Sequence, residues 1–257
     1  MTSSEQRGGS DASGCWSDGR RAESYDRPEN RAFYQAALAK LLEGAPALAG
    51  KGVDLGCGTG FSTELLVASY PAMAWQGIDI ARPMLELARR KRGLAAATFR
   101  LASAESLPLA DASVDTVVAN LSWHWFGAGA GREVRRVLRP GGWLLAAVPL
   151  RLFSGASGNR ALARVLLAGR RSFVRRPSQG LRFEAARSLL PGPLRVGRHE
   201  LYVGRESFAN GRDLLAVLDS RGALAAIFGD HPPDVLDGPA PLEFSWPLAL
   251  VHLQVPA

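Results

Sequence analysis

The sequence predicts an α/β fold with a parallel sheet and helices on both of its faces. Short apolar runs typical of buried strands alternate with segments whose apolar residues recur at helical spacing. Parallel strands need crossovers, and the helices that provide them cover the sheet. A glycine-rich turn follows the first strand, at the carboxyl end where open sheets of this kind bind ligands.

The first half of the chain contains most of this alternation. Residues 27–44 have helical spacing and end at Gly44, a suitable C-cap. We expect five strands, at residues 51–56, 74–80, 97–103, 113–122 and 143–149. We expect three helices between them, at residues 59–70, 82–93 and 131–142. The Pro140-Gly141-Gly142 sequence is expected to stop the last helix.

The alternation breaks after Pro149. Residues 151–192 are expected to be helical or loop-like, and a strand, a helix and a closing strand follow at 194–204, 207–223 and 242–255. Proline cannot donate a ladder hydrogen bond, so Pro247 predicts an edge or a bulge in the closing strand.

Composition limits the class of protein. The chain has 257 residues, 47% of them hydrophobic, which is enough for one packed core. No apolar run reaches the roughly 18 residues that a spanning helix needs. Residues 1–22 are polar and lack the apolar core of a signal peptide, so we interpret them as a disordered leader. Cys15 and Cys57 are the only cysteines, which fits a reducing, cytoplasmic location and predicts no metal site.

Positive charge is unevenly placed along the chain. The formal net charge is +7, and residues 151–205 hold 12 arginines against two glutamates. A basic region of this kind can steer an acidic partner, although an arginine-rich coding bias would give the same composition. We see no basic sheet interleaved with aromatic residues, so nucleic acid is not the expected partner.

The glycine turn distinguishes between cofactors. In "VDLGCGTG", Gly56, Gly58 and Gly60 are expected to expose backbone N–H groups and let a ligand approach closely. The dinucleotide fingerprint would need a glycine where Phe61 stands. Asp54 precedes the turn, where it would repel a pyrophosphate and attract an ammonium group. The turn therefore favours S-adenosylmethionine.

Asp79 supports the same cofactor. It ends the second strand, where a carboxylate can accept hydrogen bonds from both ribose hydroxyls. The alternative is that Asp79 only caps the helix that begins near Ala81.

Four motifs in this order resemble the class I methyltransferases, a seven-stranded Rossmann-like family: "VDLGCGTG", "GIDIA", "AESLPL" and "LRPGGWLL". The resemblance implies one methyltransferase domain over residues 23–257. Its cofactor-binding half would cover about residues 45–150, and a small helical acceptor cap with the closing strands would cover about 151–257.

The resemblance also implies roles at the methionine end of the cofactor. Asp54, Gly56 and Gly58 would line it, and Asn120 would lie beside the sulfonium. Tyr25 matches an N-terminal tyrosine that closes over the cofactor in relatives.

At the other end, Asp79 would hold the ribose and Ile80 would pack on the adenine. Ala104 and Glu105 would border the adenine edge, and Ser103 stands where many relatives carry Asp.

The segment "NLSWHWF" is expected to face the methyl acceptor. His124 is a candidate catalytic residue, as a base or as a donor that orients the acceptor. The alternative is that it only packs in an aromatic helix start, while Trp123 and Trp125 wall the pocket. A phenol or ammonium acceptor needs a base, whereas a carboxylate is already ionised and needs a cation to orient it.

The two ends of the chain resemble the malonyl-acyl carrier protein O-methyltransferases of biotin synthesis. The similar segments are "ESYDRPENRAFYQAALAKLL" and "VGRHELYVGRESFANGRDLLAVLDSRGAL". The resemblance implies a carboxylate acceptor on a substrate tethered to an acidic acyl carrier protein, with the arginine-rich 151–205 region as the docking surface. Two alternatives stay open: a methyltransferase for a free small molecule, and a non-catalytic module that binds the cofactor or RNA.

Overall fold

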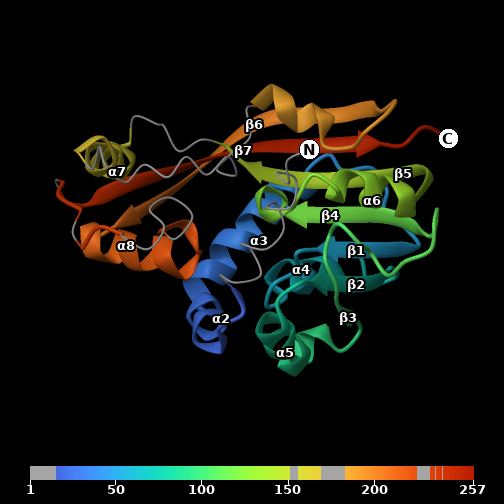
Figure 1. Cartoon of the computed structure of the whole chain (residues 1–257), viewed down its shortest axis with the longest axis horizontal. Coiled ribbons are helices and arrows are strands. Elements are labelled where there is room, and N and C mark those ends of the chain that lie inside the picture. Colours follow the sequence, from blue (N-terminus) through green and yellow to red (C-terminus); the bar gives the residue numbers. More distant parts are fainter. Residues whose placement is uncertain (1–15, 151–155, 169–182, 225–231, 235, 239) are drawn as a thin grey trace, which may run out of the picture.

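The computed structural model describes residues 16–150, 156–168, 183–224, 232–234, 236–238 and 240–257. A seven-stranded sheet in the order β3-β2-β1-β4-β5-β7-β6 runs through the middle of the molecule (Figure 1). Its strands are β1 Lys51–Leu55, β2 Ala74–Asp79, β3 Thr98–Leu101, β4 Val114–Asn120, β5 Leu138–Pro149, β6 Arg195–Phe208 and β7 Leu242–Gln254.

Strands β1 to β5 are parallel, and β7 is antiparallel to both of its neighbours. The carboxyl ends of the parallel strands therefore meet at one edge of the sheet. The strand order reverses between β1 and β4, so their connections leave toward opposite sides and a crevice opens between them. This geometry locates the site.

Helices cover both faces of the sheet. One face is covered by α3 Pro28–Leu42 and α4 Phe61–Ser69, which pack through Leu38, Leu41 and Leu66. The other is covered by α6 Ala130–Val137 and the 3₁₀ helix η3 Phe183–Ser188. The helices α2 Gly19–Tyr25 and α5 Arg82–Arg90 pack against each other beside the carboxyl edge. Two further 3₁₀ helices are η1 Arg92–Leu94 and η2 Trp123–Trp125.

A small helical cap lies beyond the carboxyl end of β5. Strands β6 and β7 stay paired as far as Phe208 and Leu242, whereas β5 pairs with β7 only from Leu248 onward. Helices α7 Ser157–Ala168 and α8 Gly211–Ser220 pack on this extension through a cluster centred on Phe244 (Figure 1).

The structure corrects the prediction for the N-terminal leader. Residues 1–15 lie outside the described residues, but residues 16–22 do not form a disordered leader, because α2 begins at Gly19. Asp18 caps this helix by accepting a hydrogen bond from the Arg20 backbone N–H at 2.9 Å. The helix is held because Ala22 is buried and Trp16 packs edge-on against Tyr25.

Two smaller predictions also change. Helix α6 ends at Val137 rather than at Pro140, because Leu138 already pairs with Val114 as the start of β5. Pro247 does not place β7 at the edge of the sheet, since β6 is the edge strand.

The position of Pro247 nevertheless has a local reason. The Leu150 backbone N–H donates to the Pro247 carbonyl at 2.8 Å, so the Pro247 nitrogen also faces the β5 side. Strand β5 ends there, and the ladder to β6 loses no hydrogen bond.

Among the described residues, no helix is both long and apolar enough to cross a bilayer. The same part of the chain contains no cluster of three or more His, Cys, Asp or Glu side chains suited to a metal ion.

Candidate active site

A cavity opens at the carboxyl ends of β1, β2 and β4, where the strand order reverses. Its walls come from these strand ends, α2, α3, the loop after β3 and η2. Eight of the nine predicted cofactor-binding residues line it: Tyr25, Gly56, Gly58, Asp79, Ile80, Ala104, Glu105 and Asn120. Asp54 and His124 are not among its lining residues.

The glycine turn works differently from the prediction. The backbone N–H groups of Gly56 and Cys57 donate to the Ile78 carbonyl at 2.8 and 3.2 Å, and that of Gly58 donates to Asp79 Oδ2 at 2.8 Å. These amides are therefore not free for a ligand. Gly56 and Gly58 have φ of 71° and 54°, in the left-handed region that glycine adopts without strain. Glycine is needed here for backbone shape and for the absence of a side chain.

The Asp79 carboxylate binds two backbone amides at once. Oδ1 accepts from the Ala81 N–H at 2.8 Å, and Oδ2 accepts from Gly58. Ala81 is itself the N-cap of α5, which has no side-chain cap, so Asp79 does not cap this helix but fixes the turn that leads into it. Burial raises the pKa of Asp79, while these backbone hydrogen bonds oppose the rise. Each oxygen keeps a second lone pair, so the group can hold both backbone amides and still accept hydrogen bonds from a diol in the cavity.

Asn120 carries an unpartnered acceptor. Its Nδ2 donates to the Tyr34 carbonyl at 2.8 Å and to Ser62 Oγ at 2.9 Å, but Oδ1 is buried without a hydrogen-bond partner. A buried carbonyl oxygen without a donor is costly. A ligand ammonium group can supply that donor, so this end of the cavity fits the methionine part of S-adenosylmethionine.

Asp54 lies behind the glycine turn. It is 1% exposed, and its Oδ2 accepts a 2.6 Å hydrogen bond from Thr63 Oγ1 of α4. Burial raises its pKa to about 7, and the hydrogen bond from Thr63 only partly opposes this. An effect of Asp54 on a ligand would therefore act through its field, not by contact with the cavity.

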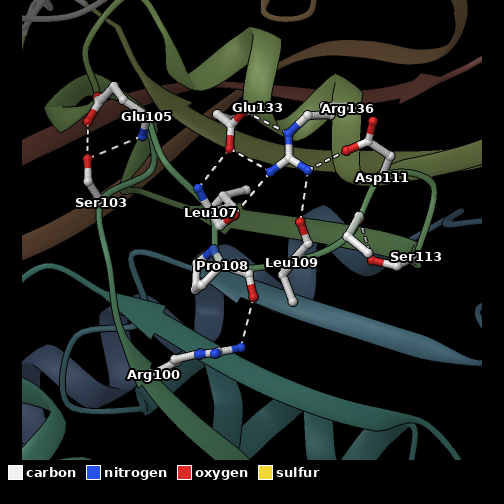
Figure 2. Close-up of polar contacts among 11 residues, drawn as sticks. Arg100, Ser103, Glu105, Leu107, Pro108, Leu109, Asp111, Ser113, Glu133 and Arg136 are labelled. Atoms are coloured by element: carbon white, nitrogen blue, oxygen red, sulfur yellow. Dashed lines mark hydrogen bonds and ion pairs between the residues drawn. The ribbon is translucent and has the colours of Figure 1, made fainter.

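The loop after β3 forms one end of the cavity. Ser103 Oγ donates to the Glu105 carboxylate and accepts from the Glu105 backbone N–H at 3.2 Å (Figure 2). The other Glu105 carboxylate oxygen accepts from the Gly127 N–H. The Glu105 carboxylate thus joins this loop to the segment after η2.

Helix α6 holds the same loop through Glu133 and Arg136, which lie above it in Figure 2. Arg136 donates to the Leu107 and Leu109 carbonyls at 3.0 and 2.8 Å and pairs with Asp111 at 2.6 Å. Glu133 accepts from the Leu107 N–H at 2.8 Å, and its hydrogen bonds with Arg136 lower its pKa to about 2.

Aromatic side chains form the wall on the acceptor side. Trp16 lies edge-on to Tyr25 and Trp125, with centroid distances of 5.6 and 6.0 Å, and Tyr25 lies 5.2 Å from Tyr34. Burial raises the pKa of both tyrosines, so both phenols remain protonated near neutral pH. Sequence reasoning missed Trp16 and Tyr34. Trp16 was missed because it falls within residues 1–22, which were predicted to be a disordered leader. Tyr34 lies within "ESYDRPENRAFYQ", but nothing in that segment marks which aromatic residues face a cavity.

His124 lies behind this wall. Its ring packs 4.9 Å from that of Trp125, and its Nδ1 is buried without a partner. Burial lowers its pKa to about 4, so the ring is neutral at physiological pH. The structure does not bring His124 into the cavity lining, and it favours the interpretation that His124 packs with its aromatic neighbours.

Comparison with known sequences agrees with this geometry. Residues 53–146 match the family described as Methyltransferase domain. A malonyl-[acyl-carrier protein] O-methyltransferase of Methylococcus capsulatus is 39% identical over 121 residues, which cover 46% of this chain and 41% of the relative. A trans-aconitate 2-methyltransferase of Methylobacterium nodulans is 41% identical over 114 residues, which cover 44% of this chain and 42% of the relative. The chain thus matches less than half the length of these curated relatives.

Solved structures share the whole fold. A SAM dependent methyltransferase from Aquifex aeolicus superposes with a TM-score of 0.56 at 14% identity and covers 93% of this chain and 98% of its own. The YcgJ protein from Bacillus subtilis gives a TM-score of 0.56 at 18% identity and covers 87% of this chain and 99% of its own. At these identities the likeness establishes the architecture alone.

Proposed function

We propose that the chain is an S-adenosylmethionine-dependent methyltransferase that methylates a carboxylate on an acyl group bound to a carrier protein. The match of residues 53–146 to the family described as Methyltransferase domain supports the class of reaction. S-adenosylmethionine supplies a methyl group on a cationic sulfur. The observation that carries the proposal is the cavity itself. Its lining includes the Asp79 carboxylate, at the end of β2, and the unpartnered Asn120 Oδ1, at the end of β4.

The residues that would hold the cofactor follow from these positions. Asn120 Oδ1 would accept from the methionine ammonium group, and Gly56 and Gly58 would leave room for the methionine chain. Asp79 would accept from the ribose hydroxyls. Ile80 is 40% exposed on the cavity wall and would pack on the adenine, while Ala104 and Glu105 would border the adenine edge.

The titratable groups of the cavity favour a carboxylate acceptor. Among the described lining residues these groups are Tyr25, Tyr34, Asp79 and Glu105. The phenols remain protonated, and the two carboxylates are bound by backbone amides on the cofactor side. None of them is suited to deprotonate a phenol or an ammonium group. A carboxylate needs no base, and the aromatic wall would exclude water around it. The described lining contains no arginine or lysine, so the cation that orients the carboxylate would have to come from outside it.

The similar proteins support the same class of acceptor. The names of the relatives from Methylococcus capsulatus and Methylobacterium nodulans specify a malonyl group and trans-aconitate, and both carry free carboxylates. The second name favours the alternative acceptor, a free small carboxylic acid. A place in biotin synthesis and a cytoplasmic location stay predictions.

The carrier protein would dock on the arginine-rich region of residues 151–205. Arg160 and Arg164 lie one turn apart on α7 and are both exposed, so the described part of this region adds positive charge to the cap. Further arginines, at positions 170, 171, 175 and 176, lie outside the described residues.

A transfer assay with methyl-labelled S-adenosylmethionine tests the proposal. The acceptors are malonyl-acyl carrier protein, malonyl-pantetheine and trans-aconitate. We expect base-labile ester on malonyl-acyl carrier protein and much less on malonyl-pantetheine. Ester formed only on the free acid would favour the alternative. Transfer of base-stable label to an amine or phenol acceptor would overturn the carboxylate assignment.

A further inference from the structure

A buried polar network joins the cap to the helices beside the cavity. Arg221 follows α8 and is 5% exposed. Its guanidinium forms a bidentate pair with Glu206 of β6 at 2.5 and 2.8 Å, and it lies 3.9 Å from the centroid of the Phe33 ring of α3. Glu206 also accepts from the Trp246 indole N–H of β7 at 2.5 Å. Three elements of the cap therefore meet α3 at one buried ion pair.

Asn30 connects this ion pair to α2. It lies in the first turn of α3 and is 1% exposed. Its Oδ1 accepts from Arg221 Nε at 2.9 Å, and its Nδ2 donates to Ser220 Oγ at 3.1 Å and to the Tyr25 carbonyl at 2.9 Å. The oxygen and both amide hydrogens are thus engaged. The carbonyl of the last residue of α2 is held by a side chain whose orientation Arg221 fixes.

A second contact runs from the end of α8 to the same wall. Gly222 has φ of 71°, and a Cβ at this position would lie 2.6 Å from the Trp16 ring. Trp16, Tyr25 and Trp125 all line the cavity, and Figure 1 shows α8 beside the α2–α3 junction. The end of α8 therefore supports the aromatic wall at two points.

We propose that Asn30 and Arg221 are positioning residues that make cofactor affinity depend on the placement of the acceptor cap. Neither lines the cavity, so both act through Tyr25. The inference rests on the proposed function only in assigning the cavity to S-adenosylmethionine. Because coupling between two ligands is reciprocal, an acceptor that fixes the cap would tighten cofactor binding by the same factor by which the cofactor tightens acceptor binding.

The chemistry of the network favours positioning over stability. The Arg221 and Glu206 side chains are 3% and 24% exposed, so the pair is largely removed from water. Such a pair adds little net stability compared with an apolar replacement, because its charges lose hydration. Its strict geometry, with two guanidinium nitrogens on Glu206 and the third on Asn30, instead fixes where Asn30 points.

Calorimetry with S-adenosylhomocysteine tests the inference without an acceptor. For Asn30→Ala we expect the Kd to rise about five- to tenfold, as for the loss of one buried hydrogen bond. Arg221→Lys keeps the charge opposite Glu206 but loses the fork geometry, and it should raise the Kd by a smaller factor. The matched control is Arg198→Lys. Arg198 also pairs with a glutamate of β6, but it donates to the Lys40 and Glu43 carbonyls at the far end of α3.

The double variant tests whether Arg221 affects cofactor affinity through Asn30. If Arg221 acts through Asn30, adding Arg221→Lys to Asn30→Ala should not raise the Kd further. Amide hydrogen exchange in the unliganded protein should speed up at residues 22–27 in both single variants and stay unchanged in Arg198→Lys.

Three outcomes would overturn the inference. In the first, wild-type protein binds S-adenosylhomocysteine and Asn30→Ala binds it equally well. In the second, the Kd of the double variant exceeds that of the wild-type protein by the product of the fold-increases of the two single variants. In the third, wild-type protein does not bind S-adenosylhomocysteine, which would overturn the proposed function as well. Failure of every carboxylate acceptor would overturn only the acceptor assignment.

Discussion

Asp54 has a carboxyl group whose charge is costly in the folded state. Burial holds its pKa near 7, against an ordinary value of 3.8. The folded protein therefore holds more protons than the unfolded chain between these two values, and this group lowers the free energy of unfolding as pH rises through that window. Compared with Asp54→Asn, the wild-type protein should lose on the order of 4 kcal/mol between about pH 4 and pH 7.

Urea unfolding of both proteins at pH 4 and pH 8 measures this difference. Asp54→Asn keeps an acceptor for Thr63 Oγ1. Its free energy of unfolding should therefore rise relative to that of the wild-type protein at pH 8, and the two values should be most similar in acid. Parallel stability curves for the two proteins would show that Asp54 titrates normally. Bound S-adenosylmethionine should shrink the difference, because a nearby positive charge favours the ionised form.

His124 provides a second test at the scale of one residue. The ring lies outside the cavity lining and has a pKa of about 4, so its protonation does not change between about pH 6.5 and 8.5. We expect kcat to be nearly flat over this range. His124→Gln should stay far from the roughly 10²–10⁴-fold loss that removal of a general base causes. A rate that rises through pH 7 and a loss of that size in the variant would instead favour a hydroxyl or amine acceptor with His124 as its base.

At the scale of elements, the loop after β3 depends on α6. Arg136 and Glu133 bind three backbone groups of this loop, the Leu107 N–H and the Leu107 and Leu109 carbonyls, and Glu105 of the same loop borders the cavity. Arg136→Met should cost about 1–3 kcal/mol of stability, because several hydrogen bonds to a charged group are lost. It should also weaken S-adenosylhomocysteine binding several-fold by releasing the adenine edge.

Arg139→Met is the matched control for this prediction. Arg139 pairs with Asp115 at 2.7 Å, and neither residue lines the cavity. We expect a change in stability without a change in the Kd. If Arg136→Met and Arg139→Met bind the ligand equally well, the loop is shaped by its own Ser103–Glu105 contacts instead.

The sequence predicts best those elements whose stabilising contacts are local in the chain. All seven strands and the helices between the parallel strands were predicted, because their apolar spacing is local. Helix α2 was missed because its buried residues, Ala22 and Tyr25, pack on residues far along the chain: Phe61, Ala81 and Met84. The glycine turn was located correctly, but not the partners of its amides, since these are the Ile78 carbonyl and Asp79 on the neighbouring strand.

At the scale of the whole molecule, the described part of the cap carries positive charge that the cavity lining lacks. The cap helix α7 carries exposed arginines, and its neighbouring segments add more, whereas the cavity lining described above contains no arginine or lysine. Such a distribution would steer an acidic partner toward the cap without placing a cation beside the cofactor's own positive charge. Capture of the partner and methyl transfer would then be separable by mutation.

Reversal of two of these charges tests that separation. Arg170→Glu with Arg171→Glu should raise the KM for malonyl-acyl carrier protein, leave the Kd for S-adenosylhomocysteine unchanged, and leave activity on malonyl-pantetheine unchanged. The effect should fall as salt rises from low ionic strength to about 0.15 M, where exposed charges are screened over about 8 Å. The control is Arg90→Glu with Arg92→Glu, an equal change of charge on the exposed side of α5 and η1, away from the cap (Figure 1). Because long-range steering depends on net charge whereas docking depends on its place, equal KM values for the two double variants would assign the effect to net charge. A KM equal to that of the wild-type protein in both variants at low salt would leave arginine-rich coding bias as the explanation of the basic region.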